Sequence, residues 1–521
     1  MKKYYLTTAI AYSSALPHVG NVYEIILADA IARFKRLEGY DVFFQTGTDE
    51  HGQKIEAQAV SQKMSPQEYV DYVSGEIKRI YDSVDIKYDQ FVRTTDARHV
   101  KAVQQIFKKL YEKGDIYLGK YEGWYSVADE SFIFEKDIVD GKGPSGDELV
   151  WTSEEAYFLK LSKYQDRLVK HIKENPAFIQ PESRKNEMLQ NFLSEPLPDL
   201  SISRTSFKWG IPVDFAPGHI VYVWVDALSN YITGLDYMPE ADQQAKMFKK
   251  WWPADVHLIG KDILRFHTIY WIIILMSLDL ELPKQVFGHP WILFNKGKMS
   301  KSTGNVMYID ELIELFGVDL IRYYVLHEIP YAQDGNITYE LLIERNNSDL
   351  ANTIGNLVNR TIGMVHKYRD GKVKKQDLGN PFELNLKQMA EEALPKMIRQ
   401  MDSLKVASAL EEVLILARAA NKYIDISQPW VLFKQPEQDK QDLLDHVLYH
   451  LLETIRYIAV LLQPFVPNTA SRIAKQIKEE NLTFESLKIF GQFQAKTLDK
   501  PEVLFERYDM EKKIEEIIKK T

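Results

Sequence analysis

The sequence predicts an α/β protein whose parallel sheet is split by an insertion and followed by an all-α part. Three observations lead to this fold class. Residues 4–46 alternate strand, helix and strand. Residues 115–234 change to a texture rich in aromatic residues, proline and glycine, without a long helical period. Residues 350–521 follow helical spacing nearly to the end of the 521-residue chain.

The opening residues form one predicted β–α–β unit. Tyr4–Ile10 is a β-rich run of strand length, and the polar stretch Tyr12–Asn21 is a predicted turn. Val22–Leu37 spaces its apolar residues as a helix does and ends just before Gly39, and Asp41–Thr46 is the next strand. A strand, a crossover helix and a second strand indicate parallel pairing with a right-handed connection.

The α/β texture returns after the insertion. Asp255–Ile259 is a predicted short strand, and Ile263–Leu278 is a predicted buried helix. Within the helical part, Asp442–Pro464 repeats apolar residues at steps of three and four, which indicates a helix with one core-facing stripe.

Composition excludes several classes of protein. Hydrophobic residues make up 45% and charged residues 27%, a globular balance that excludes a disordered chain or a fibre. The chain has no cysteine, which excludes disulfides, a cysteine nucleophile and thiolate metal sites and fits a reducing, cytoplasmic location. Its longest apolar run, Trp271–Leu278, is far shorter than the roughly 20 residues of a membrane helix. A net charge of −9 excludes a uniformly basic surface for nucleic acid but not a local basic patch.

The motif Pro17–Asn21 (PHVGN) lies between the first predicted strand and helix. A strand-to-helix turn directs backbone N–H groups and the helix dipole toward one place, which favours an anion. Gly20 allows a base or a phosphate close to the backbone, and His18 can donate to a phosphate oxygen. Alone the motif is weak, since a histidine in a turn is more often structural.

A second motif, Gly297–Ser302 (GKMSKS), holds two lysines and two serines beside a glycine. Such a loop can bring cations and hydroxyls onto a triphosphate. An exposed basic loop is the simpler interpretation of any single lysine pair. The complete string is much rarer than its parts and favours phosphate binding.

Together the two motifs resemble the paired signature of the class I aminoacyl-tRNA synthetases, a "HIGH"-type turn and a "KMSKS" loop. Further strings resemble the methionyl-tRNA synthetase family over essentially the whole chain: Tyr4–Tyr12, Thr46–Gly52 (TGTDEHG), Val221–Ala227 (VYVWVDA), His257–His267 and Gly288–Ser302. The resemblance implies a Rossmann-like catalytic domain in two halves (1–114 and 235–290), a connective insertion (115–234), a KMSKS-loop and stem-contact region (291–349) and a helical anticodon-binding domain (350–521).

The activity implied by the resemblance has two steps. Methionine reacts with ATP, accompanied by Mg²⁺, to give methionyl-adenylate and pyrophosphate. The methionyl group then passes to the 3′-terminal adenosine of initiator and elongator tRNA(Met), read by its CAU anticodon. Charge develops on phosphate oxygens, so positioning and electrostatic stabilisation are expected to dominate catalysis.

By motif match, His18 contacts the α- to β-phosphate region, and Lys298 and Lys301 hold the leaving pyrophosphate. These three residues and Asn21 form the expected catalytic set. The implied ATP-binding set is His18, Gly20, Asn21, Glu24, Gly260, Asp262, Trp291, Ile292, Leu293, Lys298, Ser300 and Lys301.

A thioether is apolar and polarisable, so its pocket needs aromatic walls and one or two polar groups. Asp49 is expected to pair with the α-ammonium group of methionine. Plain core packing is the alternative for the tryptophans. The full set implied for methionine is Ile10, Tyr12, Asp49, Trp224, Ala227, Leu228, Tyr231, Ile263, Phe266, His267 and Trp271.

Anticodon reading is assigned by the same resemblance to Asn356, Arg360, Pro429 and Trp430. Asn356 and Arg360 are one helical turn apart. An indole can stack on an unpaired base, although Trp430 could equally be an interhelical core residue.

The sequence departs from the family pattern at three points. Asn21 replaces the second histidine of the first motif, Leu228 replaces a proline found in some relatives, and the missing cysteines predict that the family's structural zinc is absent, so no metal-binding residue is assigned. A short charged helix over Tyr508–Thr521 leads us to expect a monomer. Three alternatives remain open: another class I enzyme, a catalytically altered tRNA-binding or regulatory protein, and a dehydrogenase, which the missing G-x-G-x-x-G motif disfavours.

Overall fold

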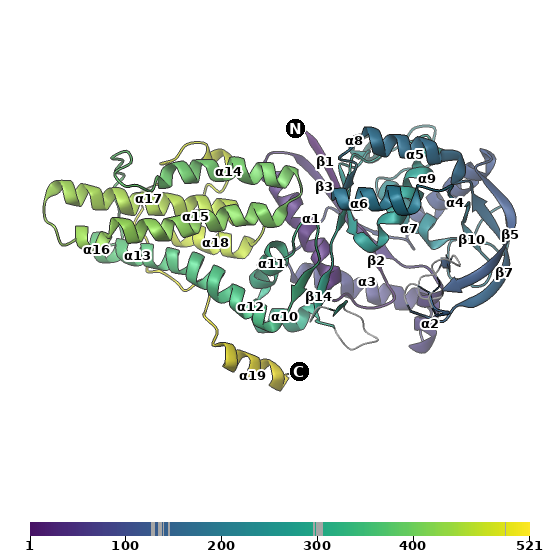
Figure 1. Cartoon of the computed structure of the whole chain (residues 1–521), viewed down its shortest axis with the longest axis horizontal. Helices are drawn as coiled ribbons and strands as arrows, with labels where there is room; N and C mark the ends of the chain where they lie inside the picture. The colour runs from purple at the N-terminus through teal and green to yellow at the C-terminus, as the bar shows by residue number, and fades with distance from the viewer. Residues whose placement is uncertain are drawn as a thin grey trace. The chain divides into compact units, whose positions relative to one another are not determined.

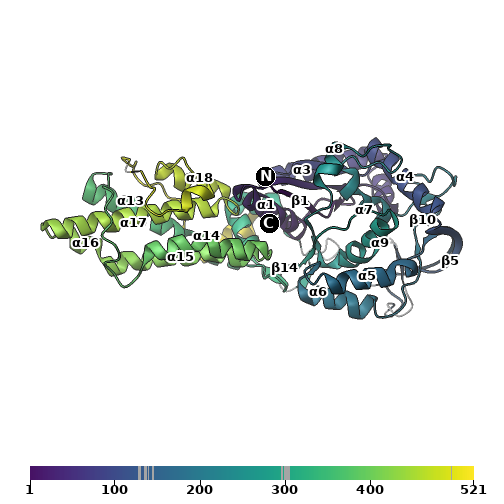
Figure 2. The same cartoon turned by 90° about the horizontal axis from the view of Figure 1, so that it is seen from above.

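A computed structural model describes residues 1–126, 131–133, 138, 140–143, 146–294, 297–298, 306–494 and 496–520. The chain divides into two compact units (Figures 1 and 2). The sheet unit comprises Met1–Ala28 and Asp41–His289, and the helical unit comprises Asp29–Tyr40 and Pro290–Thr521. Among the described residues, no helix combines the length and apolarity needed to cross a membrane.

A parallel sheet forms the centre of the sheet unit. Its strand order is β2-β3-β1-β12-β13-β8, with β4 paired to β3, and every pairing is parallel. This confirms the predicted α/β class. The strands are β1 (Lys3–Thr8), β2 (Ala11–Tyr12), β3 (Asp41–Asp49), β4 (Gln90–Arg93), β8 (Ile179–Gln180), β12 (Val256–Gly260) and β13 (Val286–His289).

The first helix begins earlier than its apolar spacing predicts. α1 spans Val19–Leu37, so Gly20 and Asn21 lie in its first turn and not in the preceding loop. The backbone N–H groups of Asn21 and Val22 both donate to the His18 carbonyl, at 2.9 and 3.1 Å. Val19 is completely buried, which extends the apolar face by one turn.

β3 is three residues longer than the predicted strand and ends at Asp49. Gly47 permits this extension, because a Cβ there would lie 2.0 Å from the Val92 carbonyl oxygen of β4. The helices that follow are α2 (Gln53–Ser61), α3 (Pro66–Ser83) and α4 (Ala97–Glu112).

The predicted insertion contains an antiparallel sheet in the order β6-β5-β7-β9. It does not stay apart from the parallel sheet, since β8 returns to pair with β13. The five-part division of the chain therefore stays a prediction. The elements of residues 115–234 besides β8 are β5 (Ile116–Ser126), β6 (Ser131–Ile133), β7 (Val150–Leu159), α5 (Ser162–Glu174), α6 (Glu182–Glu187), β9 (Leu200–Ser201), β10 (Ser203–Arg204), β11 (Ile220–Val221) and α7 (Val223–Thr233), and α8 (Lys246–Trp251) follows them.

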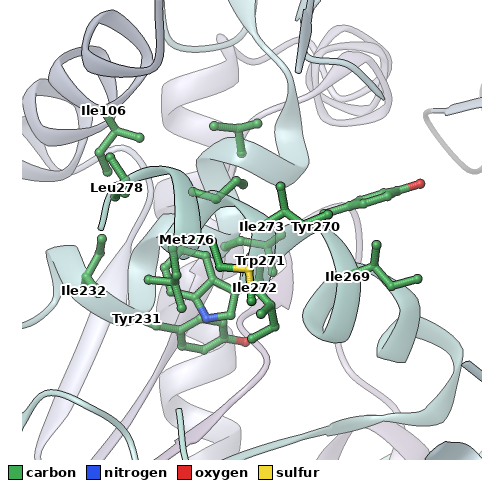
Figure 3. Close-up of a cluster of buried hydrophobic side chains, with 14 of the residues drawn as sticks. Ile106, Tyr231, Ile232, Ile269, Tyr270, Trp271, Ile272, Ile273, Met276 and Leu278 are labelled. Atoms are coloured by element: carbon green, nitrogen blue, oxygen red, sulfur yellow. The ribbon is translucent and has the colours of Figure 1, made fainter. Parts of the chain in front are cut away.

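The predicted buried helix Ile263–Leu278 is not one regular α-helix. A 3₁₀ turn (Lys261–Ile263) and a π-helical turn (Phe266–Tyr270) precede α9 (Trp271–Ser277). Figure 3 shows side chains of this segment packed with Tyr231 and Ile232 of α7 and Ile106 of α4 in one apolar cluster. π-helical turns are frequent at functional sites, and this one carries Phe266 and His267.

The helical unit opens with a small sheet in which β14 pairs with β15 and β16. α17 contacts α13, α14, α15, α16 and α18, and all its residues from Leu444 to Leu462 are buried. The predicted helix is confirmed, but it is buried on all sides instead of along one stripe. The elements are β14 (Ile292–Phe294), β15 (Gly297–Lys298), α10 (Ile309–Phe316), α11 (Val318–His327), β16 (Gly335–Ile337), α12 (Tyr339–Arg345), α13 (Asn356–Arg369), α14 (Leu386–Asp402), α15 (Val406–Ser427), α16 (Pro429–Leu432), α17 (Gln438–Leu462), α18 (Pro467–Gln476) and α19 (Met510–Lys520).

Candidate active site

The candidate active site lies at the carboxyl edge of the parallel sheet. β1, β12 and β13 are neighbours, so the residues that follow β1 meet Gly260 at the end of β12 and His289 at the end of β13. Ligands of open α/β sheets bind outside the carboxyl ends of the strands. The sheet thereby brings the His18 turn to the same edge as Asp262, although the two are distant in sequence.

Hydrogen bonds fix the His18 turn from both sides. The backbone N–H of Gly20 donates to His18 Nδ1 at 3.1 Å. Because Nδ1 is an acceptor, the proton of a neutral imidazole resides on Nε2, which is then a donor. The His18 backbone N–H donates to Asn21 Oδ1 at 3.2 Å. The amide oxygen of Asn21 thus stabilises the turn, and a motif match alone does not reveal this role.

Glu24 lies one turn further along α1. Its Oε2 is 2.9 Å from His289 Nε2, and the Tyr23 ring packs edge-on against the His289 ring at 5.1 Å. Burial raises the pKa of Glu24, partly offset by the hydrogen bond to His289, and the charge of Asp262 raises it further. A Cβ on Gly260 would lie 2.5 Å from Asp262 Oδ1, so these residues also form one packed corner.

An aromatic cluster unites α7 with the π-helical turn. Trp224 stacks on Phe266 with ring centroids 3.8 Å apart and 2° between the planes. Tyr231 lies 5.7 Å from both the His267 and the Trp271 ring centroids. Ala227 and Leu228 are buried on α7, Ile263 is half-buried beside His267, and Ile10 and Tyr12 are half-buried after β1. Most of the predicted methionine set therefore lies in one region.

His267 links the two walls of this cluster. Its Nδ1 lies 2.9 Å from the Ile263 carbonyl, which can only accept, so Nδ1 carries the proton. Nε2 then accepts from the Tyr231 hydroxyl at 2.7 Å. Burial lowers the pKa of His267 to about 4. The imidazole is consequently neutral at pH 7, and its tautomer is fixed by the fold.

Acidification is expected to destabilise the sheet unit through His267. The pKa in the unfolded chain is near 6.5 and in the fold about 4, so this contribution is complete above pH 6.5 and lost as pH falls toward 4. The loss reaches about 3 kcal/mol. Denaturant unfolding at pH 7.5 and 4.0 measures it, with His267→Phe as reference. Burial also lowers the pKa of His257, which likewise makes the free energy of unfolding fall as the pH falls. If the free energy of unfolding of His267→Phe depends on pH as strongly as that of the wild type, the effect arises from a group other than His267.

Asp49 is at the end of β3, opposite Tyr12 of β2. The residue is 8% exposed, and its backbone carbonyl accepts from the Ser13 N–H at 2.9 Å. This pairing ties Asp49 to the segment that leads into the His18 turn.

A buried polar network around Asp226 was not predicted from the sequence. Asp226 is 0% exposed and accepts from His51 Nδ1 through Oδ2 and from His99 Nε2 through Oδ1, both at 2.7 Å. Burial alone would raise the pKa of Asp226, but the two imidazoles outweigh it and the pKa is lowered. Thr233 Oγ1 lies 2.7 Å from His99 Nδ1. The network holds α7 against the segment that follows Asp49.

Glu50 extends this support. Arg93 donates to its two carboxylate oxygens at 2.7 and 2.9 Å, and Trp209 Nε1 donates to its backbone carbonyl at 2.6 Å. The motif strings contained Glu50, His51 and Asp226, but only Asp226, the one carboxylate in the otherwise apolar string Val221–Ala227, stood out as a possible signal.

The helical unit carries the remaining nucleotide-site residues. Leu293 of β14 is paired with Lys298 of β15, and the Trp291 N–H donates to Asp334 Oδ1 at 3.0 Å. Only the backbone of Lys298 is described. Ser300 and Lys301 lie outside the described residues.

The residues assigned to the anticodon lie on α13 and α16. Asn356 begins α13 and is exposed, and Arg360 Nη2 lies 3.3 Å from Asp425 Oδ1. Pro429 is buried at the start of α16, and the adjacent Trp430 is 38% exposed. Trp430 is therefore not an interhelical core residue.

Comparisons with known proteins agree with this architecture. Residues 4–149 and 137–362 match the family described as tRNA synthetases class I (M), and residues 376–519 match the anticodon binding domain of methionyl tRNA ligase. The parallel sheet and these matches define a class I aminoacyl-tRNA synthetase. Methionine–tRNA ligase of Clostridium tetani is 52% identical over 99% of this chain and 80% of the relative, and that of Bacillus subtilis is 47% identical over 98% and 79%. The chain belongs to the methionine–tRNA ligase family.

A solved structure supports the same placement. Methionyl-tRNA synthetase of Mycobacterium tuberculosis, in complex with methionyl-adenylate, superposes with a TM-score of 0.92 at 42% identity, covering 97% of this chain and 100% of that one.

Proposed function

We propose that this chain is a methionine–tRNA ligase that activates methionine with ATP and then charges tRNA(Met). One observation carries the proposal: a stacked aromatic cluster with a neutral, hydrogen-bonded histidine lies at the sheet edge that carries the His18 turn. It occurs in a chain 42% identical to a synthetase solved with methionyl-adenylate. Residues suited to bind a thioether and residues suited to bind a nucleotide thus lie near each other in the sheet unit.

In the first step the methionine carboxylate attacks the α-phosphorus of ATP, and pyrophosphate leaves. His18 Nε2, made a donor by the Gly20 contact, hydrogen-bonds to phosphate oxygens as charge develops. Lys298 and Lys301 hold the pyrophosphate, and Mg²⁺ accompanies the ATP. Gly260 and Asp262 bind the ribose region, while Trp291, Ile292 and Leu293 meet the adenine.

The thioether is bound by apolar and aromatic surface. Trp224, Phe266 and Trp271 supply polarisable ring faces, and the Tyr231–His267 pair supplies the polar end of the pocket. Asp49 pairs with the α-ammonium group. Tyr231 and His267 already hydrogen-bond to each other and to the backbone. The methionine sulfur accepts only weak hydrogen bonds, so it does not need a strong donor from this pair.

Trp430 and Arg360 read the CAU anticodon of initiator and elongator tRNA(Met), with Asn356 and Pro429 beside them. An indole that is 38% exposed can stack on an unpaired base, a contact worth roughly 1–3 kcal/mol. Arg360 must exchange its contact with Asp425 for one to the RNA. A monomeric state and a cytoplasmic location stay predictions from the sequence.

Amino-acid-dependent ATP–pyrophosphate exchange tests the proposal. Across a panel of the standard amino acids, exchange is expected with methionine and at most weakly with the others, since a polarisable thioether suits the aromatic cluster. Exchange led by leucine or cysteine would contradict the specificity. Exchange with none would favour the alternative, a regulatory protein that binds tRNA without activating an amino acid.

The second arm of this experiment charges a transcript with a CAU anticodon and the same transcript with an altered anticodon. Trp430→Ala is expected to keep exchange and to lose charging of the CAU transcript. Trp151→Ala, which also removes an exposed tryptophan, is the matched control and should keep both activities. Equal charging by the two variants would contradict the anticodon role.

A further inference from the structure

His327 ends α11 and lies between two carboxylates of the helical unit. Its Nδ1 is 2.8 Å from Glu328 Oε1, and its Nε2 is 3.1 Å from Glu411 Oε2 on α15. An ionised carboxylate only accepts, so both ring nitrogens must carry a proton to make these two hydrogen bonds. A neutral imidazole has one proton and would turn a lone pair toward one of the carboxylates. The geometry therefore indicates an imidazolium.

The charges around this imidazole balance when it is protonated. Arg345 Nε of α12 lies 2.9 Å from Glu328 Oε1, and Arg345 Nη1 lies 3.6 Å from Asp349 Oδ2. On α15, Arg418 pairs with Glu411. Three carboxylates thus face two guanidinium groups, and the imidazolium supplies the third positive charge.

An aromatic neighbour and the two carboxylates hold the ring in its charged form. The Tyr323 ring stacks on the His327 ring with centroids 5.1 Å apart and 13° between the planes, and its hydroxyl donates to Asp349 Oδ2 at 2.8 Å. Burial alone would lower the pKa of His327, but the hydrogen bonds to Glu328 and Glu411 outweigh it, and the pKa is raised. The ring is half-buried, so its proton can exchange with water. The imidazole therefore loses its charge at a pH above 6.5.

The cluster joins the elements that lead to the predicted anticodon residues. Its members come from four elements: α11 (His327), α12 (Arg345), the π-helical segment Asn346–Gly355 (Asp349) and α15 (Glu411). α13 follows the π-helical segment directly, and α16 follows α15 after a single residue. The residues assigned to the anticodon lie on α13 and α16. The position of α15 against the π-helical segment therefore sets the position of α16 against α13.

Contacts along α15 continue from the cluster to the anticodon residues. Asn421 Nδ2 of α15 donates to the Thr353 carbonyl of the π-helical segment at 2.9 Å. One turn further along α15, Asp425 Oδ1 lies 3.3 Å from Arg360 Nη2 of α13. Glu411 and Asp425 are about 21 Å apart along one helix at 1.5 Å per residue. A displacement of α15 at Glu411 is thereby transmitted to the anticodon surface by a rigid element.

We propose that His327 is a positioning residue for tRNA binding. As an imidazolium it holds α11 and the π-helical segment against α15, and it thereby keeps α13 and α16 in the arrangement that the anticodon loop requires. Loss of the proton removes one of the two hydrogen bonds and leaves three carboxylates opposite two guanidinium groups. tRNA affinity then falls, while the sites for ATP and methionine keep their geometry. The inference rests on the proposed anticodon role of α13 and α16.

Two measurements on the full chain, from pH 6 to 9 at constant ionic strength, test this inference. Histidine labelled with ¹³C at Cε1 gives one NMR signal per ring, and the signal missing from His327→Gln belongs to His327. Its pKa is expected above 6.5. Through the same pH, the dissociation constant of a transcript with a CAU anticodon should rise at least about fivefold, because protonation and tRNA binding are linked. Methionine-dependent ATP–pyrophosphate exchange should show no step at that pH.

Two variants separate positioning from a general effect on folding. His327→Gln stays neutral and should bind the transcript at every pH as weakly as the wild type does at pH 9. Glu411→Gln keeps the ring but removes one carboxylate charge, so the pKa of His327 and the midpoint of the binding step should both move to lower pH. His366→Gln is the matched control: glutamine can still donate to the Asp499 carbonyl, which His366 Nε2 contacts at 2.8 Å, and the step should remain.

Three results would overturn the role of His327: a pKa at or below 6.5, a binding step that persists in His327→Gln, or a midpoint that does not move in Glu411→Gln. If His327→Gln does not fold, the two shifts in Glu411→Gln decide. The proposed function is judged separately. A wild-type chain without methionine-dependent exchange contradicts that function, whereas exchange without a pH step in tRNA binding contradicts only the role of His327.

Discussion

Asp226→Ala is expected to lower the free energy of unfolding of the sheet unit by about 3–5 kcal/mol. The Asp226 carboxylate is completely buried and accepts from His51 and His99 at 2.7 Å. Its removal leaves two buried imidazoles without their acceptor and a void beneath α7. Denaturant unfolding followed by tryptophan fluorescence measures the loss, and hydrogen exchange should localise it to α7.

Asp214→Ala is the matched control for this substitution. Asp214 is exposed and its carboxylate accepts from Gln104 at 2.7 Å, so its loss should cost less than about 1 kcal/mol. Since α7 also carries Trp224, Asp226→Ala should raise the KM for methionine more than the KM for ATP. Equal small losses of stability in the two variants would show that the buried network does not support the fold.

The alternation of strands and helices in the sequence was sufficient to predict the parallel sheet, because a crossover helix between two strands returns the chain to the edge where the first strand began. It could not give the exact helix start at Val19, because capping by the His18 carbonyl depends on atomic contacts. The π-helical turn at Phe266–Tyr270 was equally invisible, since an apolar run reads the same in either helix. The apolar stripe of α17 likewise could not show that neighbouring helices cover its other faces.

Motif resemblance identified the candidate site residues, whereas only the structure showed which other residues hold them in place. Asp226 is 175 residues from His51 and 127 from His99, and nothing local in the sequence pairs them. The role of Asn21 is similar: the motif marks the position, but the bond from the His18 N–H to its oxygen depends on the geometry of the turn. Long-range polar contacts require the fold before they can be assigned.

Two substitutions at His18 are expected to separate catalysis from folding of the turn. Asparagine places its amide oxygen near the position of His18 Nδ1 and can still accept from the Gly20 N–H, but it has no donor at the position of Nε2. Glutamine places an amide N–H near the position of Nε2 and gives up the Gly20 contact. ATP–pyrophosphate exchange with methionine should therefore fall about 10²–10³-fold in His18→Asn and distinctly less in His18→Gln.

Methionine binding, followed by tryptophan fluorescence, should change little in either variant, because His18 contacts phosphate and not the thioether pocket. The order of the exchange rates of the two variants decides the role of His18. If the substitutions acted only by disturbing the turn, exchange would fall more in His18→Gln than in His18→Asn. If His18→Asn keeps wild-type exchange while His18→Gln loses it, the imidazole acts only through its bond to Gly20. A phosphate role requires the opposite order, which places the catalytic contribution on Nε2.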